Sequence, residues 1–88
     1  MTIFSVSYDL ITPGQKYTAL FRELEKTDHL HHLDSNWLIC TNETAEGLCY
    51  RLRQHLDDND NLLVIKVTRP YYGWLPESSW AWISSRLE

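Results

Sequence analysis

The sequence predicts an α+β protein in which one antiparallel sheet carries two helices on a single face. Two observations lead to this class. Segments with the alternating pattern of strands are interleaved with segments of helical periodicity, and their order along the chain is strand, helix, strand, strand, helix, strand. That βαββαβ order is the pattern of the ferredoxin-like fold. With 88 residues, the chain has the size of one domain, spanning 1–88.

The first strand is predicted over residues 3–9, because apolar and more polar residues alternate along it and give it two different faces. The apolar face consists of Phe4, Val6 and Tyr8. The other face carries Ser5 and Ser7, and we expect this small, polar surface to receive a partner's sheet or the aromatic end of the chain. Asp9 ends the strand shortly before the turn-forming segment Thr12-Pro13-Gly14.

The first helix is predicted from about Pro13 to Lys26, since Thr12 and Gln15 have the spacing of a capping box around a proline at the first helical position. Its apolar face recurs at helical spacing and consists of Tyr17, Leu20, Phe21 and Leu24. Two short apolar runs, 29–33 and 37–40, then flank the turn-prone triplet Asp34-Ser35-Asn36. This arrangement predicts a β-hairpin.

Thr44 is placed to cap a second helix, which the acidic cluster 57–61 would end. One face of this helix carries Ala45, Leu48, Cys49, Leu52 and Leu56. The continuous apolar run 62–67, broken only by Lys66, predicts a central strand.

The tail, residues 69–88, has no place in the basic fold. We expect an extended part followed by a short helix that Pro76 opens. Trp80, Ile83 and Leu87 fall on one side of that helix. The tail is therefore expected to cover the open sheet face, an edge strand or a partner chain. Four Trp, five Tyr and two Phe in so short a chain predict a homodimer that buries some of these rings.

A formal charge of −4 argues against strong nonspecific nucleic-acid binding, although a local basic face is compatible with it. Cys40 and Cys49 form no C-x-x-C pair and no disulfide framework. The chain shows no signal-like start and no apolar run of the roughly 20 residues that a membrane span needs. The expectation is a cytoplasmic protein without a membrane partner.

Asp9 is the first candidate site residue. A hard cation such as Mg²⁺ binds carboxylate oxygens and water, so a carboxylate at the end of a strand is a candidate metal ligand. The alternative interpretation is a turn aspartate that accepts hydrogen bonds from nearby backbone amides.

Three histidines, His29, His31 and His32, form a second cluster. On a strand, His29 and His31 would share a face and could chelate a metal ion, or one histidine could act as a general base. No third ligand stands at a recognised spacing. The alternative is a polar stripe on an exposed strand or at a dimer surface.

The candidate binding residues are mostly basic. Arg51, Lys66 and Arg69 could contact phosphates, with Ser7 beside the strand end, or the basic residues could pair with surface carboxylates. Aromatic residues of the tail could stack on bases or pack in an interface. The tail rings in question are Tyr71, Tyr72, Trp74, Trp80 and Trp82.

Five segments of the chain resemble the superfamily of small Cas-two-like and VapD-like proteins, and most closely its SinR-like branch. They are Ser7-Tyr8-Asp9-Leu10, Pro13-Gly14, Leu33-Asp34-Ser35-Asn36-Trp37-Leu38, Asn59-Asp60-Asn61-Leu62-Leu63-Val64-Ile65 and Gly73-Trp74-Leu75-Pro76-Glu77. The resemblance implies a homodimer with packed sheets and with the strand-one aspartate, Asp9, near the dimer axis.

Members of this superfamily include metal-dependent nucleases, CRISPR-associated scaffolds and toxin-related ribonucleases. The resemblance therefore implies a weakly active, magnesium-dependent nuclease centred on Asp9, with RNA favoured over DNA as its substrate. Gln15-Lys16-Tyr17 stands where the CRISPR members have an arginine-rich helix start, and the chain is acidic, which argues against spacer acquisition. The alternative is a noncatalytic homodimeric interaction or scaffold module.

Overall fold

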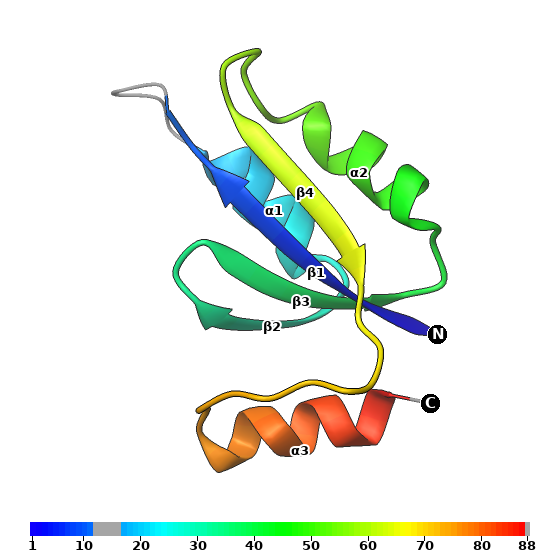
Figure 1. Cartoon of the computed structure of the whole chain (residues 1–88). Coiled ribbons are helices and arrows are strands. Elements are labelled where there is room, and N and C mark those ends of the chain that lie inside the picture. The colour runs from blue at the N-terminus through cyan, green and yellow to red at the C-terminus, as the bar shows by residue number, and fades with distance from the viewer. Residues whose placement is uncertain (12–16, 88) are drawn as a thin grey trace.

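The computed structural model describes residues 1–11 and 17–87, and these residues form four strands and three helices. In chain order, the elements are β1 (Thr2–Asp9), α1 (Thr18–Glu25), β2 (Asp28–Leu33), β3 (Asn36–Thr41), α2 (Ala45–Arg53), β4 (Asn61–Lys66) and α3 (Glu77–Arg86) (Figure 1). The strands form one antiparallel sheet in the order β2-β3-β1-β4. The predicted α+β class is confirmed.

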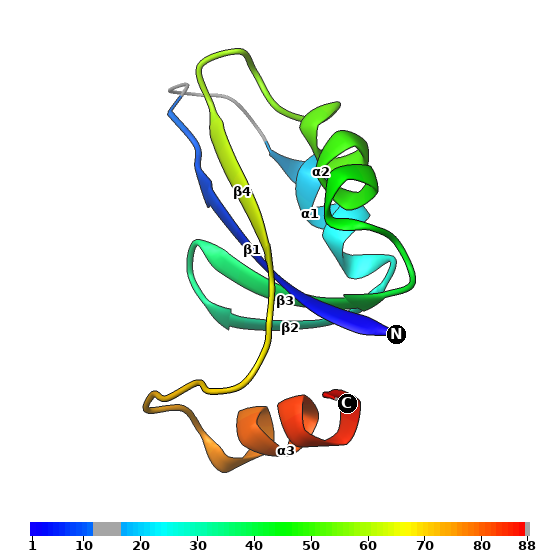
Figure 2. The same cartoon turned by 45° about the vertical axis from the view of Figure 1, so that its right-hand side comes forward.

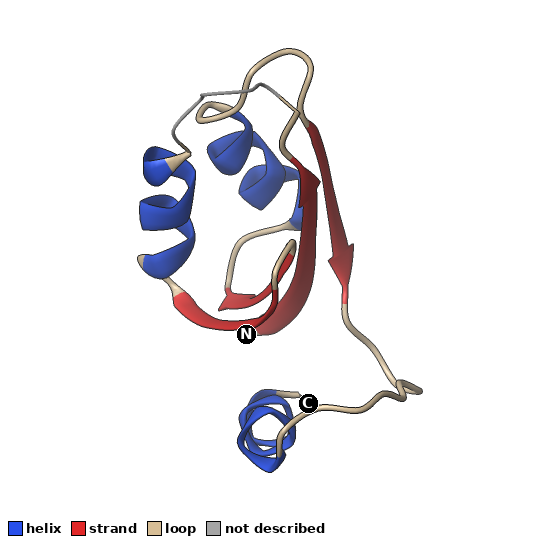
Figure 3. Ribbon diagram, turned by 90° about the vertical axis from the view of Figure 1, so that its left-hand side faces the viewer, coloured by secondary structure: helices blue, strands red, loops and turns tan. Residues whose placement is uncertain are grey.

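The two faces of the sheet are covered differently. Helices α1 and α2 lie side by side on one face, which we call the helix face, whereas α3 lies apart from them (Figure 3). The core between the sheet and these two helices contains Phe4, Val6, Leu20, Leu24, Trp37, Ile39, Leu48 and Leu52. A second, smaller core joins α3 to the opposite face, which we call the open face, and contains Ile3, Leu38, Cys40 and Ile83.

Strand β1 has the alternation that the sequence predicts. Phe4 and Val6 are buried against the helices, and Ile3 points to the open face, where it packs in the smaller core. Because β1 pairs with both β3 and β4, it is the strand that places its alternate side chains at the centre of each face.

The two helix starts differ in how they are capped. The hydroxyl of Thr44 accepts a hydrogen bond of 3.0 Å from the backbone N–H of Gly47, so the predicted cap of α2 is confirmed. Helix α1 begins at Thr18 behind Tyr17, whose side chain makes no cap hydrogen bond. The predicted capping box from Thr12 to Gln15 lies outside the described residues.

The predicted hairpin is confirmed as β2 and β3, with Asp34 and Ser35 at its turn. Asn36, which the sequence places in the turn, is instead the first residue of β3 and pairs with Ser7. The pairing of β2 with β3 is irregular between Leu30 and Leu33.

The prediction of a central strand over 62–67 is wrong, because β4 pairs only with β1 and forms an edge of the sheet. Leu62 and Val64 pack on the helix face. The other apolar residues of the strand, Leu63 and Ile65, are 56% and 52% exposed. The segment is apolar throughout because both faces of β4 carry apolar side chains. Within this chain, only the helix face of β4 is covered.

The tail crosses to the open face and covers one end of it (Figure 2). Between β4 and α3 its side chains alternate: Tyr71 and Leu75 pack into the smaller core. Tyr72 and Trp74 project away and are 99% and 100% exposed. None of the helices in residues 1–11 and 17–87 has the length and apolar character needed to cross a membrane.

Candidate functional site

The predicted site residues that lie on a common surface do so on the uncovered part of the open face. Antiparallel pairing places directly opposed residues on the same side of a sheet, so the register of β1 with β3 and β4 identifies this surface. Its members are Ser5, Ser7, Asp9, Asn36, Asn61, Leu63 and Ile65. Helix α3 reaches only the opposite end of the same face (Figure 2).

A short polar ladder crosses the middle of this surface. The side-chain amide of Asn36 donates hydrogen bonds to the hydroxyls of Ser5 and Ser7, at 2.9 and 2.6 Å. Both hydroxyls are therefore held as acceptors, and no described base activates either of them. Ser7 lies next to Asp9 along the surface, as the strand alternation predicts.

Asp9 lies in a shallow recess of about 260 Å³ together with Ser7, Asn61 and Leu63. Its side chain is exposed. The oxygen atoms that the recess could offer to a metal ion belong to a carboxylate, an amide carbonyl and a hydroxyl, and Mg²⁺ prefers oxygen ligands of this kind. They supply one carboxylate, and within the described part of the chain no three His, Cys, Asp or Glu side chains gather around a common point.

Asp60 makes turn-type hydrogen bonds of the kind that the alternative interpretation gives to Asp9. Its Oδ1 accepts hydrogen bonds from the backbone N–H of Ile11, at 2.9 Å, and from the hydroxyl of Tyr17, at 2.8 Å. Its Oδ2 accepts from the N–H of Asp57 at 2.9 Å. Sequence reasoning assigned Asp60 only to a helix stop. The turn preference of aspartate gave a local signal for this role, but no local pattern identifies the distant partners.

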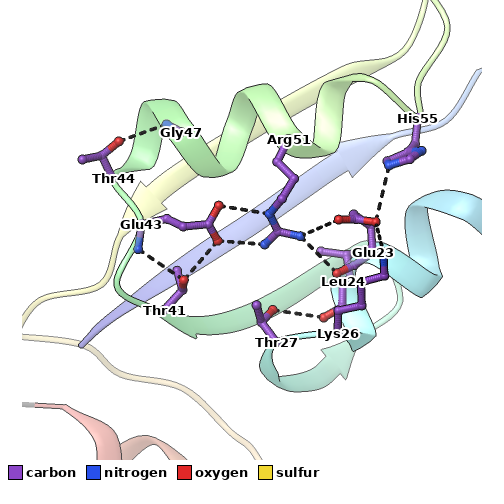
Figure 4. Close-up of polar contacts among 10 residues, drawn as sticks. All are labelled: Glu23, Leu24, Lys26, Thr27, Thr41, Glu43, Thr44, Gly47, Arg51 and His55. Carbon is purple, nitrogen blue, oxygen red and sulfur yellow. Dashed lines mark hydrogen bonds and ion pairs between the residues drawn. The ribbon is translucent and has the colours of Figure 1, made fainter.

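Arg51 has carboxylate partners on two sides (Figure 4). Its guanidinium donates to both carboxylate oxygens of Glu43, at 3.0 and 2.8 Å, and to Oε1 of Glu23 at 3.0 Å. The carboxylate of Glu23 also accepts a hydrogen bond of 2.9 Å from the Nζ of Lys26. The cluster ties α1, α2 and the end of β3 together, so Arg51 sits on the helix face in a structural ion-pair network.

These contacts shift the protonation equilibria of the cluster. Hydrogen bonds from Lys26 and then Arg51 lower the pKa of Glu23, and the fork of Arg51 lowers the pKa of Glu43. The same carboxylates, Glu43 foremost, raise the pKa of Arg51. All three groups are held in their charged forms, and the positive charge of Arg51 is matched by two negative ones.

Lys66 and Arg69 meet at the opposite end of β1 from Asp9. They line a cavity of about 300 Å³ with Arg86 and the start of the chain. Arg86 is itself bonded to Asp28 and lies 4.3 Å over the ring of Trp82. In the pairing of β1 with β4, Lys66 lies opposite Phe4 and Asn61 lies opposite Asp9. Lys66 and Asn61 are five residues apart along the strand, so Lys66 is about 17 Å from the end of the sheet that carries Asp9.

The three histidines are divided between the two faces. His29 and His31 lie against Trp37, with ring centroids 5.3 and 4.1 Å away, and their shared face agrees with the prediction. His32 points to the open face beside the tail. Its Nδ1 is buried without a hydrogen bond to any described residue, and burial lowers the pKa of its imidazole.

A groove of about 410 Å³ runs between the open face and the tail, and we call it the tail groove. Its lining includes Ser5, His32, Leu33, Leu38, Val67 and Ile83, with the tail residues 71–75 and Trp80 on the other side. Tyr71 stacks on Trp80 at 6.0 Å. Among the described residues, no Asp, Glu, Lys or Arg lines this groove.

The geometry thus separates the predicted site residues into three places. Asp9 and Ser7 share the open face, Lys66 and Arg69 lie at the far end of the sheet, and Arg51 is on the helix face. Comparison with protein-family models, with curated proteins and with solved structures finds no match to this chain.

Proposed function

We propose that this protein is a noncatalytic homodimeric interaction module, in which the open face and the tail bind a second copy of the chain. The observation that carries this proposal is the uncovered apolar side of β4. Leu63 and Ile65 are each more than half exposed on the open-face side of this edge strand, whereas a solvated sheet face normally alternates to polar residues. Large apolar side chains left exposed at adjacent positions of one sheet face, as here, are a feature of protein–protein interfaces.

The total surface of the chain supports the same conclusion. Its accessible area is 5953 Å², whereas a folded monomer of 10.4 kDa is expected to expose about 5,400 Å². The excess is about 550 Å², and a standard interface buries about 800 Å² on each partner. A dimer through the open face would therefore remove an amount of surface similar to what this chain exposes in excess.

The polar residues favour binding over catalysis within one copy. Asp9 is the single carboxylate of its recess, and the hydroxyls of Ser5 and Ser7 accept hydrogen bonds from Asn36 instead of facing a base. Arg51 is neutralised by Glu23 and Glu43, so it offers little positive charge to a phosphate.

We also propose that the fold is ferredoxin-like. The strand order β2-β3-β1-β4, the antiparallel pairing and the two helices on one face all support it. This topology agrees with the resemblance to the Cas-two-like and VapD-like superfamily, from which a homodimer with packed sheets is expected.

Sedimentation equilibrium tests the dimer directly. We expect twice the 10.4 kDa monomer mass at micromolar concentration. Leu63→Lys should give monomers, because it places a charge in the interface without disturbing the core. Tyr50→Lys is the matched control, since Tyr50 is an exposed apolar-bodied residue on α2, away from the open face, at 72% exposure against 56% for Leu63. A wild-type protein that stays monomeric throughout the range would contradict the proposal.

A second candidate function is metal-dependent cleavage of RNA, and the position of Asp9 favours it. Asp9 lies on the same face as Leu63 and Ile65, so a dimer through that face would bring two Asp9 carboxylates toward each other. With Ser7 and Asn61 they offer oxygen donors of the kind that Mg²⁺ binds. A magnesium ion held there would supply charge stabilisation at a phosphate.

This second candidate is tested with single-stranded RNA, Mg²⁺ and the Asp9→Asn variant, which keeps the size of the side chain and removes its charge. Cleavage by the wild type that is lost in the variant would support it. Equal residual cleavage by both proteins would indicate contamination and would contradict it, whatever the oligomeric state.

A further inference from the structure

The short tail segment 71–75 forms one wall of the tail groove and also carries two exposed aromatic residues, Tyr72 and Trp74. Tyr71 and Leu75 face inward and build one wall of the groove. Tyr72 and Trp74 alternate with them and project from its rim, with 99% and 100% of their surface exposed. The same segment therefore presents both an apolar recess and a pair of large apolar side chains with nothing to cover them.

We propose that Tyr72 and Trp74 of one protomer insert into the tail groove of a second protomer, and that the second protomer returns the same contact. This inference rests on the homodimer proposed above and names the contact that holds it together. A two-fold symmetric interface uses one patch on both subunits, and the patch here is self-complementary because its recess and its projecting rings are neighbours.

The areas involved agree with this arrangement. A buried aromatic side chain removes roughly 150–250 Å² from water, so the pair accounts for roughly 300–500 Å² per protomer. The surface that the chain exposes in excess is about 550 Å². The groove, at about 410 Å³, has room for aromatic side chains at its mouth.

The charges favour a second copy over a nucleic acid as the occupant. No charged side chain lines the groove, so inserting an aromatic ring leaves no ion without water or a partner, as in the core of a protein interface. Stacking of single-stranded bases normally accompanies a positively charged groove. The nearest basic residues, Lys66 and Arg69, line a different cavity.

Two variants remove the two halves of the contact separately. Trp74→Ala removes the inserted ring, and Leu33→Glu places a charge in the groove at a residue that is already 55% exposed. Each should weaken dimerisation by at least about 30-fold, as expected for a central aromatic contact. Tyr50→Ala removes an exposed ring from α2, outside the groove, and should leave the dimer unchanged. Thermal melts at low concentration check that all variants fold alike.

Mixing the two defective variants gives the sharpest test. In a mixed dimer, Trp74 of the Leu33→Glu copy meets the groove of the Trp74→Ala copy, which keeps Leu33 and carries no introduced charge, so one of the two contacts is restored. The mixture should therefore associate more tightly than either variant alone, as measured by sedimentation equilibrium.

Three outcomes would overturn the inference. If Trp74→Ala dimerises as tightly as the wild type, the open face forms the dimer without this contact, and the homodimer proposal survives alone. If the mixture associates no better than its components, the exchange is not reciprocal. If the wild type is monomeric, the homodimer proposal and this inference fail together.

Discussion

Arg51 shows how a single residue can connect three elements. It extends from α2, and its partners are Glu43 after β3 and Glu23 in α1. Its planar fork matches the two oxygens of Glu43, which is the geometry that makes arginine–carboxylate pairs strong. The side chains are only partly exposed, at 26% for Arg51 and 15% for Glu23, so solvent screens them less than an ordinary surface pair.

Replacing Arg51 by Ala should lower the free energy of unfolding by about 2 kcal/mol, because two carboxylates lose their charged donor. The lowered pKa values of Glu23 and Glu43 mean that their contribution is fully present above pH 4.5 and is lost as the pH falls below that value. Urea unfolding at pH 7 and pH 3 should therefore show a large difference between wild type and variant only at pH 7. Arg53→Ala, at an exposed position of the same helix, is the control, and an equal loss there would contradict the assignment.

His32 should make attachment of the tail sensitive to acid. Burial lowers the pKa of its imidazole below the ordinary value of 6.5, with a smaller effect of the same sign from His31. The unfolded chain therefore binds the proton more tightly, so the stability is complete above pH 6.5 and decreases as the pH falls through that value. The melting temperature should fall between pH 7.5 and pH 5.5.

The measurement that isolates this effect is the difference between wild type and His32→Leu, since both proteins share the other histidines. The loss on acidification should be smaller in His32→Leu. An unchanged loss would contradict the assignment of this pH dependence to His32.

At the residue scale, the sequence predicts roles that depend on near neighbours and fails on roles that depend on distant ones. The cap at Thr44 is encoded within four residues, so its pattern is sufficient. The carboxylates of Arg51 come from positions 8 and 28 residues away. Asp60 reaches Ile11 across 49 residues. No local pattern carries that information.

Among the elements, β4 differs most from what the periodicity suggests, whereas α3 follows Pro76 and turns Trp80, Ile83 and Leu87 toward the smaller core as expected. An apolar run identifies a strand, but the position of that strand in the sheet depends on which neighbours it acquires. The same limit applies to the tail, where Trp80 and Ile83 share a helix side. The structure buries Ile83 to 5% exposure and leaves Trp80 half-buried, so Ile83 is the main anchor of α3.

Replacing Ile83 by Ala should lower the free energy of unfolding by about 3 kcal/mol, because it leaves a cavity among Ile3, Leu38 and Cys40. The near-ultraviolet circular dichroism of the tail tryptophans should weaken in parallel. Ser84→Ala, at the next and exposed position, is the control. An unchanged melting temperature for Ile83→Ala would mean that α3 is only loosely attached and does not complete the core.

For the whole molecule, two opposing terms would control association into the proposed homodimer. The apolar open face and tail favour it, whereas the net charge of −4 on each protomer opposes it. Repulsion between exposed charges is screened when the Debye length becomes shorter than their separation. The open-face contact itself involves apolar residues and an uncharged groove, so added salt should weaken the repulsion without breaking any interfacial ion pair.

The dimer should therefore become tighter by roughly a few-fold when the salt concentration rises from about 0.02 M to about 0.3 M. Binding to nucleic acid would respond in the opposite direction, because salt competes with phosphate contacts. Sedimentation equilibrium across this range, at one fixed pH, measures the effect. A variant with two exposed carboxylates neutralised, Glu46→Gln with Asp58→Asn, should show a smaller response because less repulsion remains to be screened. Dissociation of the wild-type dimer by salt would contradict an apolar interface and indicate that ion pairs hold the two copies together.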